Sequence, residues 1–295
     1  MTKVNINSPK EIALSYSASR VEKANLTIVK MLLLGILAGM FVALAGAGST
    51  IAQATVASTH LASIGKLLGA AVFPVGLVMI LLAGSELFTG NCLIIIPVLQ
   101  KEIKLRSMLK NWFFVYIGNF IGSMLIALMT AYSGIYSLFD NAAAVHAISI
   151  AVTKANMDFG DALIRGILCN FLVCIAVWIA YAAKDLVGKL LGLFMPTMLF
   201  VLCAFEHSIA NMYFIPTGLF LVRWNFNYVS AFSNTHGFEN LAGLGWRNML
   251  INNIIPATIG NAIGGAILVG MVYWFLYLRE PPAKAHLKVK ARIKK

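Results

Sequence analysis

The sequence predicts an all-α membrane protein with six transmembrane helices, arranged as an inverted repeat of three helices plus three. Three observations lead to this fold: a composition that is 60% hydrophobic and only 12% charged, a series of long uncharged runs, and a glutamate–asparagine motif in each half. Together they predict a single transmembrane domain over residues 1–295, with repeats at about 28–139 and 160–278 and tails at 1–27 and 279–295.

Uncharged runs give the positions of the spans, because about 20 apolar residues cross a bilayer as a helix. Four runs, at 31–65, 111–139, 166–183 and 248–278, each suffice for one crossing. Two more runs are interrupted once each, 67–100 by Glu86 and 190–222 by the adjacent Glu206 and His207. We therefore expect six crossings, with the second and the fifth broken near their middles.

The basic residues predict how the chain is oriented. The formal net charge is +12, and if the N-terminus is cytoplasmic, 18 of the 23 Lys and Arg residues lie in the two tails and two inner loops. The remaining five are on the outer side: Lys66, Lys154, Arg165, Arg223 and Arg247. This positive-inside distribution predicts a multi-pass protein of the inner or plasma membrane with both termini cytoplasmic. The basic tail 284–295 then contacts lipid headgroups or fixes orientation, and we expect no nucleic-acid partner.

The segment before the first span is predicted to form a short helix over residues 8–23 on the inner surface, with Ile12 and Tyr16 facing lipid. The four cysteines fall within the predicted spans and lack metal-ligand spacing. Buried cysteine commonly behaves as a small hydrophobe. We therefore expect no disulfide, no metal site and no cofactor.

Three sequence matches recur in the same order in the two halves. The segments 86–91 and 206–211 share the pattern Glu-x4-Asn, 35–39 matches 166–170, and 118–122 matches 260–264. Because each half has an odd number of crossings, the second half enters from the opposite side and the repeat is inverted. The broken helices then meet near the membrane midplane, where irregular backbone is tolerated only against protein or a water-lined cavity. This arrangement predicts a transport pore.

The polar residues of the breaks have a structural and a functional interpretation. A carboxylate near the bilayer centre costs a few kcal/mol or more. We expect Glu86 and Glu206 to be structural, accepting hydrogen bonds from opened backbone or capping a half-helix, because a negative charge on the path would repel an anion. The asparagines that we expect to support the bundle are Asn91, Asn119, Asn211 and Asn261.

His207 differs from these residues, because it is the only histidine in the middle of a span and can titrate in the physiological range. We favour a functional role for His207, with a core histidine as the alternative. Thr89 lies in the other break, so a Thr89–His207 contact across the pseudo-axis is predicted. Lys23 and Lys154 precede spans one and four, and by themselves they indicate only surface charges.

At these residues the chain resembles the formate/nitrite transporter family. The segment 204–212, Ala-Phe-Glu-His-Ser-Ile-Ala-Asn-Met, resembles the family's fifth-span signature, and 87–89, Leu-Phe-Thr, matches its second-span loop. The segment 254–265 resembles its sixth span, and Lys23 and Lys154 stand at the family's spacing from Gly39 and Gly166. The resemblance covers about 23–280 and is closest to the formate branch.

The resemblance implies an aquaporin-like fold, a homopentamer with one pore per subunit, and passage of small monovalent anions such as formate, nitrite or hydrosulfide. It also implies roles for individual residues. Those residues are Leu87, Phe88 and Phe200 as hydrophobic constrictions, Thr89 and His207 as the central polar contact, and Lys23 and Lys154 as anion-attracting groups at the two mouths.

The free-energy costs favour protonation of the anion during its passage through the pore. Desolvating a bare anion costs tens of kcal/mol in the idealised limit, whereas protonating an acid of pKa about 3.8 at pH 7 costs about 4 kcal/mol. A lysine about 4 Å away contributes about 4 kcal/mol at an effective dielectric of about 20, enough to collect anions at a mouth but not to carry them through. We therefore expect the lysines to collect the anion, His207 to help deliver a proton, and the neutral acid to pass.

Three other classes of protein remain as alternatives. A neutral-solute channel would share the inverted repeat, but the sequence lacks paired Asn-Pro-Ala boxes. A membrane enzyme is disfavoured, because the sequence has no His-Glu-x-x-His motif and no obvious serine nucleophile to act with His207. A receptor or scaffold would show no flux.

Overall fold

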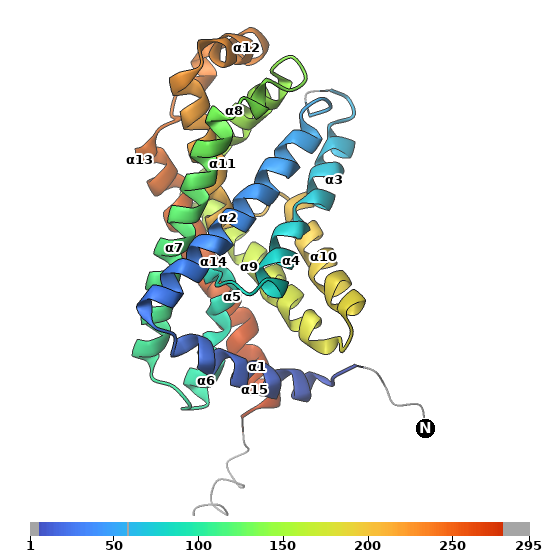
Figure 1. The fold of residues 1–295 in the computed structure, drawn as a ribbon, viewed down its shortest axis with the longest axis vertical. Coiled ribbons are helices and arrows are strands. Elements are labelled where there is room, and N and C mark those ends of the chain that lie inside the picture. Colours follow the sequence, from blue (N-terminus) through green and yellow to red (C-terminus); the bar gives the residue numbers. More distant parts are fainter. Residues whose placement is uncertain (1–5, 58, 280–295) are drawn as a thin grey trace, which may run out of the picture.

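The computed structural model describes residues 6–57 and 59–279. Within these residues the chain is helical, and its only β-structure is an isolated bridge between Ile6 and Ala183. The long helices run along the longest dimension of the molecule, and α1 (Pro9–Ala24) lies across one end (Figure 1). We call this the α1 end, and the opposite end, formed by α8 (Ala142–Ala155) and α12 (Phe226–His236), the α12 end.

The first half contains three spans, the second of them broken. Its elements are α2 (Ile28–Gln53), α3 (Ala62–Val72) and α4 (Pro74–Leu82), then after the break α5 (Phe88–Asn91), η1 (Cys92–Ile94) and α6 (Ile95–Leu99), and last α7 (Leu105–Tyr132). The break between α4 and α5 contains Glu86, as predicted.

The second half repeats this order. Its elements are α9 (Phe159–Ala182), then α10 (Leu186–Leu202) and α11 (Ser208–Trp224) on either side of the break, and last α13 (Trp246–Asn248), η4 (Met249–Ile254), α14 (Ile255–Ala262), η5 (Ile263–Met271) and α15 (Val272–Tyr277). By length and composition, five helical stretches of the described chain can cross a membrane, and α10 with α11 supplies the remaining, broken span. The predicted all-α fold with two broken spans is confirmed.

The connections at the α12 end form a packed cap. The segment 223–247, whose two ends are the predicted outer residues Arg223 and Arg247, contains α12 and η3 (Phe238–Leu241), while η2 (Ile135–Ser137) precedes α8. A separate apolar cluster under these elements includes Tyr136, Ile148, Tyr228 and Phe232. The long connection between spans five and six therefore has a core of its own.

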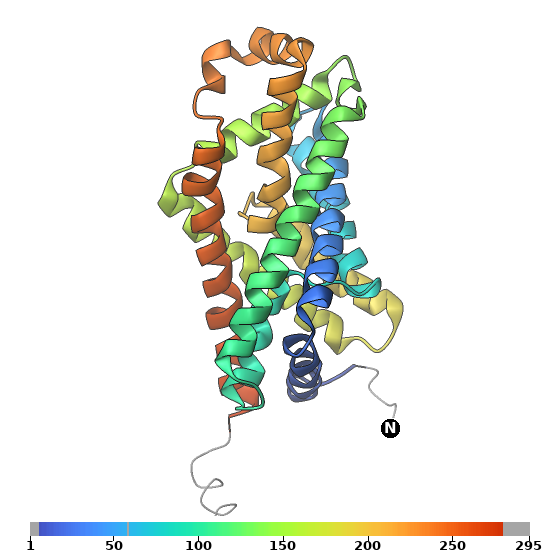
Figure 2. The same ribbon diagram turned by 60° about the vertical axis from the view of Figure 1, so that its left-hand side comes forward.

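Glycines allow the two main helix crossings. α2 and α7 lie side by side (Figure 2), and a Cβ on Gly122 would overlap the carbonyl oxygen of Ile36. In the second half, a Cβ on Gly264 would overlap the carbonyl oxygen of Ile167 where η5 meets α9. Close approach of membrane helices commonly depends on such small residues.

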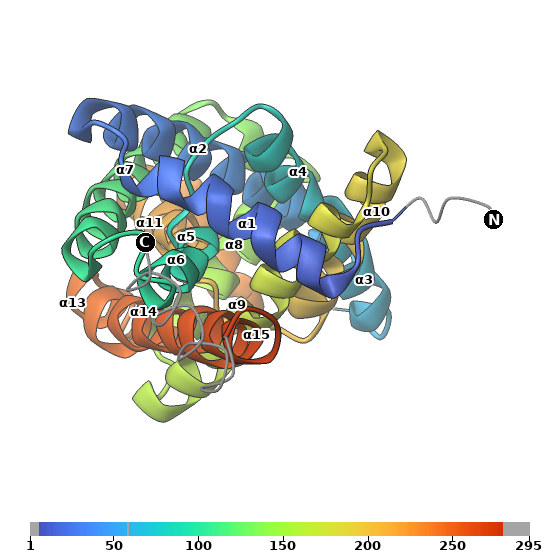
Figure 3. The ribbon, with the colours of Figure 1, turned by 90° about the horizontal axis from the view of Figure 1, so that it is seen from below.

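The predicted lipid-facing side of α1 was wrong. Ile12 and Tyr16 are only 4% and 0% exposed. Figure 3 shows α1 crossing the ends of the other helices, and Tyr16 packs on Trp178 and Tyr181 of α9 at centroid distances of 5.8 and 4.9 Å. The apolar side of α1 meets protein because this helix covers the ends of the bundle.

Candidate pore and its two vestibules

At the first break, the side chain of one asparagine forms hydrogen bonds with backbone groups of the opened helix. The Asn119 amide nitrogen donates to the carbonyl oxygens of Gly35 at 2.8 Å and Glu86 at 2.9 Å. The Asn119 carbonyl oxygen accepts from the Phe88 N–H at 2.9 Å. Backbone groups that the break would leave unpaired are thereby satisfied, as a membrane interior requires.

Asn261 makes the same three hydrogen bonds at the second break. Its amide nitrogen donates to the carbonyl oxygens of Gly166 at 2.8 Å and Glu206 at 2.9 Å, and its carbonyl oxygen accepts from the Ser208 N–H at 2.9 Å. The two breaks lie on opposite sides of the molecular centre, one facing α1 and the other facing α8. Equivalent contacts in opposite directions support the inverted repeat that the sequence predicts.

The glutamate side chains do not bind opened backbone but pair with the lysines. Lys23 Nζ lies 2.6 Å from Glu86 Oε1, and Lys154 Nζ lies 2.8 Å from Glu206 Oε1. This differs from the expectation for Glu86 and Glu206, because Asn119 already satisfies the backbone at the first break, as its counterpart does at the second.

Further asparagines complete each ion pair. Asn91 donates to Glu86 at 2.7 Å and to Asn111 at 2.8 Å. In the second half, Asn211 and Asn253 donate to Glu206 at 2.6 and 2.9 Å. Asn111 and Asn253 were not predicted from the sequence, although each stands eight residues before the asparagine that closes a break.

Thr89 and His207 meet between the two breaks. Thr89 Oγ1 lies 3.1 Å from His207 Nε2, and the residues are 0% and 4% exposed. His207 Nδ1 accepts the N–H of Ala210 at 3.1 Å and so caps α11. The neutral ring therefore carries its proton on Nε2 and donates it to Thr89. The Thr89 hydroxyl proton is then left for another acceptor.

The backbone of Thr89 is fixed by α9. Asn170 Nδ2 donates to the Thr89 carbonyl oxygen at 3.1 Å, and the Cys174 thiol approaches the same oxygen at 3.6 Å. Asn170 also donates to the carbonyl oxygen of Asn261 at 2.6 Å. The Asn170 side chain of α9 therefore links α5, which contains Thr89, to the sixth span.

A vestibule lies on each side of this contact. The α12-end vestibule is a cavity of about 360 Å³, and its lining includes Lys154, Glu206, His207 and Phe200. The α1-end vestibule is a cavity of about 320 Å³, and its lining includes Lys23, Glu86, Leu77 and Leu87. Both predicted lysines thus stand at a mouth, at opposite ends of the molecule.

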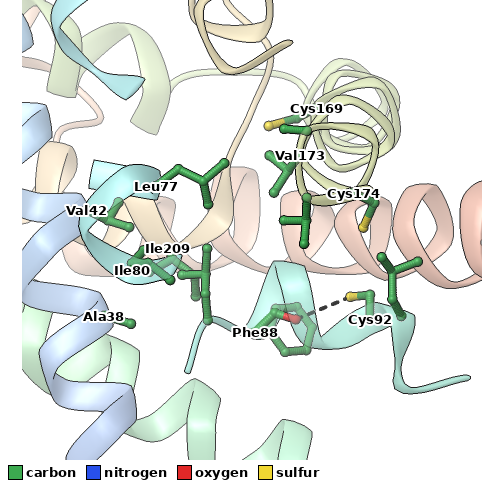
Figure 4. Close-up of a cluster of buried hydrophobic side chains, with 14 of the residues drawn as sticks. Ala38, Val42, Leu77, Ile80, Phe88, Cys92, Cys169, Val173, Cys174 and Ile209 are labelled. Atoms are coloured by element: carbon green, nitrogen blue, oxygen red, sulfur yellow. Dashed lines mark hydrogen bonds between the residues drawn. The ribbon is translucent and has the colours of Figure 1, made fainter. Parts of the chain in front are cut away.

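Apolar side chains separate the vestibules. Phe200 stacks on His207 at a centroid distance of 5.9 Å, and Phe73 meets Phe200 edge-on at 5.7 Å. Figure 4 shows Leu77, Ile209 and neighbouring apolar side chains from several helices converging in one buried cluster. Phe73 and Leu77 were not predicted from the sequence, because they lie in a uniformly apolar run.

The three predicted constriction residues have different surroundings. Leu87 lines the α1-end vestibule and Phe200 lines the α12-end vestibule. Phe88 is 4% exposed and packs edge-on against Trp112 and Tyr116, at 5.6 and 5.1 Å. All three belong to the same apolar cluster.

Comparison with known proteins identifies the family. The family model described as formate/nitrite transporter matches residues 10–275. The chain belongs to the formate/nitrite transporter family. It is 34% identical to a probable formate transporter of Methanothermobacter thermautotrophicus, over 94% of this chain and 99% of that protein. It is 35% identical to the formate channel FocA of Escherichia coli K12, over 92% and 95% of the two chains.

Solved structures agree with the fold. A structure described as a pentameric formate channel with formate bound has a TM-score of 0.76 and 32% identity, covering 85% of this chain and 98% of that one. An FNT family ion channel has the same TM-score at 24% identity, covering 90% and 98%. These relatives are channels and transporters rather than enzymes, and this chain is a membrane transport protein of the same kind.

Proposed function

We propose that the protein conducts small monovalent anions, formate foremost, between its two vestibules. The observation that carries the proposal is the arrangement of charge along this axis. A lysine–glutamate pair stands at each mouth, and the Thr89–His207 contact is set in the apolar region between them. The formate transporters and channels among the relatives favour formate over nitrite or hydrosulfide.

Proton delivery sets a specific requirement on His207. A neutral imidazole cannot give up its Nε2 proton without forming an imidazolate, so the donor must be the imidazolium. Forming the imidazolium adds a proton to Nδ1, which then loses its hydrogen bond from Ala210. Loss of a helix cap costs about 0.5–2 kcal/mol. The charged ring is thus a transient state at the start of α11.

Thr89 relays that proton in the proposal. Its hydroxyl oxygen takes the Nε2 proton of His207 while its own proton passes to a carboxylate oxygen of formate. Neutral formic acid then crosses the apolar side chains, and His207 is left neutral with its proton on Nδ1. Exchange of that proton with water restores the resting ring, protonated on Nε2, and its hydrogen bond from Ala210. The transfer conserves charge, because an imidazolium and an anion become two neutral species.

Assembly and orientation follow the relatives and the basic residues. We infer a homopentamer, in line with the related formate channel described as pentameric. We infer that the α1 end faces the cytoplasm, in accordance with the positive-inside distribution. Mass measurement of the purified protein in detergent tests the first inference, and protease access to an N-terminal tag in vesicles tests the second.

Flux into liposomes tests the proposed function. We expect the purified protein to carry labelled formate into liposomes with saturation, and nitrite or hydrosulfide more slowly. Empty liposomes and liposomes with a misfolded variant are the controls. Water or glycerol flux without any formate flux would contradict the proposal and favour a neutral-solute channel.

A further inference from the structure

α1 buries an arginine that has no acidic partner in the described part of the chain. Arg20 is 3% exposed, and its guanidinium carbon lies 4.1 Å from the centre of the Tyr16 ring. One terminal nitrogen donates to the Tyr16 hydroxyl, and the buried Nε has no hydrogen-bond partner among the residues that the structure describes. Among residues 6–57 and 59–279, no carboxylate forms an ion pair with Arg20. Burying such a charge is unfavourable unless a partner or a ligand offsets it.

The position of Arg20 connects this charge to the transport path. Arg20 lines the α1-end vestibule together with Lys23 and Glu86. Glu86 is already paired with Lys23 at 2.6 Å, so the buried Arg20 and the half-buried Lys23 stand beside a single buried carboxylate. The other acid of the lining, Glu22, is exposed, and solvent screens its charge. Among the described residues, and leaving out the exposed Glu22, the lining of this vestibule therefore has a surplus of one positive charge.

The guanidinium is held in place rather than free to move. The Tyr16 hydroxyl accepts from Arg20 and lies 3.5 Å from the carbonyl oxygen of Gly90 in α5. The Tyr16 ring also packs on Trp178 and Tyr181. A fixed cation beside the vestibule loses little conformational freedom when it binds an anion.

The repeat does not require this arginine. Lys23 and Lys154 are equivalent, because each pairs with the glutamate of its own break. Arg20 stands three positions before Lys23, and the residue three positions before Lys154 is Ala151. Ala151 is fully buried and apolar. The surplus charge is thus a property of the α1 end and not of the shared scaffold.

We propose that Arg20, next to the Lys23–Glu86 pair, forms an anion-binding site of the α1-end vestibule that takes a small monocarboxylate. The inference rests on the proposed function for its role, since formate would bind here before it enters the apolar path. The cavity of about 320 Å³ has ample room for an ion of this size. A monovalent anion offsets the one uncompensated charge.

Uptake measured from each face tests the site. Membrane vesicles that expose the α1 end to the medium, identified by protease access to an N-terminal tag, are compared with vesicles of opposite orientation. We expect Arg20→Met to raise the half-saturating formate concentration several-fold from the α1 end, with little change from the α12 end. Arg20→Lys keeps the charge and should have the smaller effect. Equal effects from both faces, or none, would overturn the proposal.

Arg106→Met is the matched control, because it removes an exposed charge from the same end of the molecule, in the first turn of α7. It should leave the half-saturating concentration unchanged.

A second measurement does not depend on flux. Sodium formate should raise the Tm of the purified wild type more than sodium chloride at equal ionic strength, since a ligand that binds only the folded state stabilises it. Arg20→Met should reduce this difference. If Arg20 were only a structural anchor, its replacement would shift Tm equally in both salts, which would contradict the site. Formate-specific stabilisation without flux would retain the site and reject the proposed function.

Discussion

The two vestibules share a scaffold but differ in the residues that face the path. Each has a lysine–glutamate pair, supporting asparagines and an asparagine that closes the break. By the register of this scaffold, His207 is equivalent to Leu87, and Thr89 to Ile209. Each polar member of the central contact therefore has an apolar counterpart in the other half.

This comparison separates structural from chemical roles. Residues that recur at equivalent positions satisfy backbone and neutralise buried charge, which both halves need in a membrane. Residues that differ, such as Thr89, His207 and Arg20, are not needed for that purpose. We therefore expect mutations of the asparagines that close the breaks to affect folding, and mutations of the differing residues to affect transport. The lysines recur too, but they line the vestibules, so their replacement should also change anion capture.

Replacing the asparagine that closes a break should have the largest effect, and the same effect in both halves. Each of Asn119→Leu and Asn261→Leu leaves two buried backbone groups of a break unpaired, one carbonyl and one N–H, at about 1–3 kcal/mol each. That sum is a large fraction of the whole stability of many proteins. We expect both variants to lose folded protein, measured by size-exclusion chromatography and melting in detergent.

Asn227→Leu is the control, because Asn227 is exposed on α12. It should melt like the wild type. If only one of the two break variants loses stability, the halves are not equivalent in structure.

His207→Asn should abolish the pH dependence of formate uptake while the protein stays folded. Asparagine preserves hydrogen bonding at the start of α11 but cannot titrate. The measurement is formate uptake into liposomes between about pH 5 and 8, around the reference histidine pKa of about 6.5. Retention of the wild-type profile by His207→Asn would reduce His207 to a core histidine.

His146→Gln is the matched control. His146 lies in α8, outside the spans, and lines the same α12-end vestibule as His207. Burial, together with the nearby Lys66 and His236, lowers the pKa of His146 to about 4. It is therefore neutral between pH 5 and 8, and its replacement should leave the profile unchanged. Thr89→Val should add little in the His207→Asn background if the two residues act as one unit.

Much of the fold could be predicted from the sequence, because membrane spans are marked by composition alone. The breaks were found because Glu86 and Glu206 interrupt apolar runs. What the apolar side of α1 packs against was not predictable in the same way. Its apolar residues suit lipid or protein equally, and only the tertiary structure shows that Tyr16 packs on α9.

The candidate site was predicted where polar residues stand out and missed where they do not. Thr89 and His207 are polar in apolar segments, and the structure brings them into contact. Phe73 and Leu77 have apolar neighbours on every side in sequence, so nothing marks them as facing the path. In the sequence, Arg20 is only one of several basic residues in the N-terminal tail. Its burial could not be predicted, because a short polar segment does not show which of its side chains pack against the bundle.

Lys154→Ala should weaken anion capture from the α12 end. Lys154 is 16% exposed at its side chain and pairs with Glu206, so its loss also leaves a buried carboxylate that repels anions. We expect the half-saturating concentration to rise about tenfold, or ~1.4 kcal/mol, with a smaller decrease in maximal flux. The measurement is uptake from the α12 end. Adding Glu206→Gln should recover part of the loss, and an unchanged half-saturating concentration in Lys154→Ala would leave Lys154 without a role in capture.

The smallest effect concerns the pH dependence of capture at the α1 end. Burial lowers the pKa of Lys23 to about 8, and the charge of Arg20 lowers it further while that of Glu86 opposes the shift. Lys23 is therefore charged below pH 8 and loses its proton as the pH rises through that value, so anion capture should weaken about two- to threefold between about pH 7 and 9. The half-saturating concentration is the quantity to measure, because the rate also includes the proton step at His207. Arg20→Met removes the like charge and should move this transition to higher pH, whereas a transition that stays at the same pH would show that Arg20 and Lys23 do not share a site.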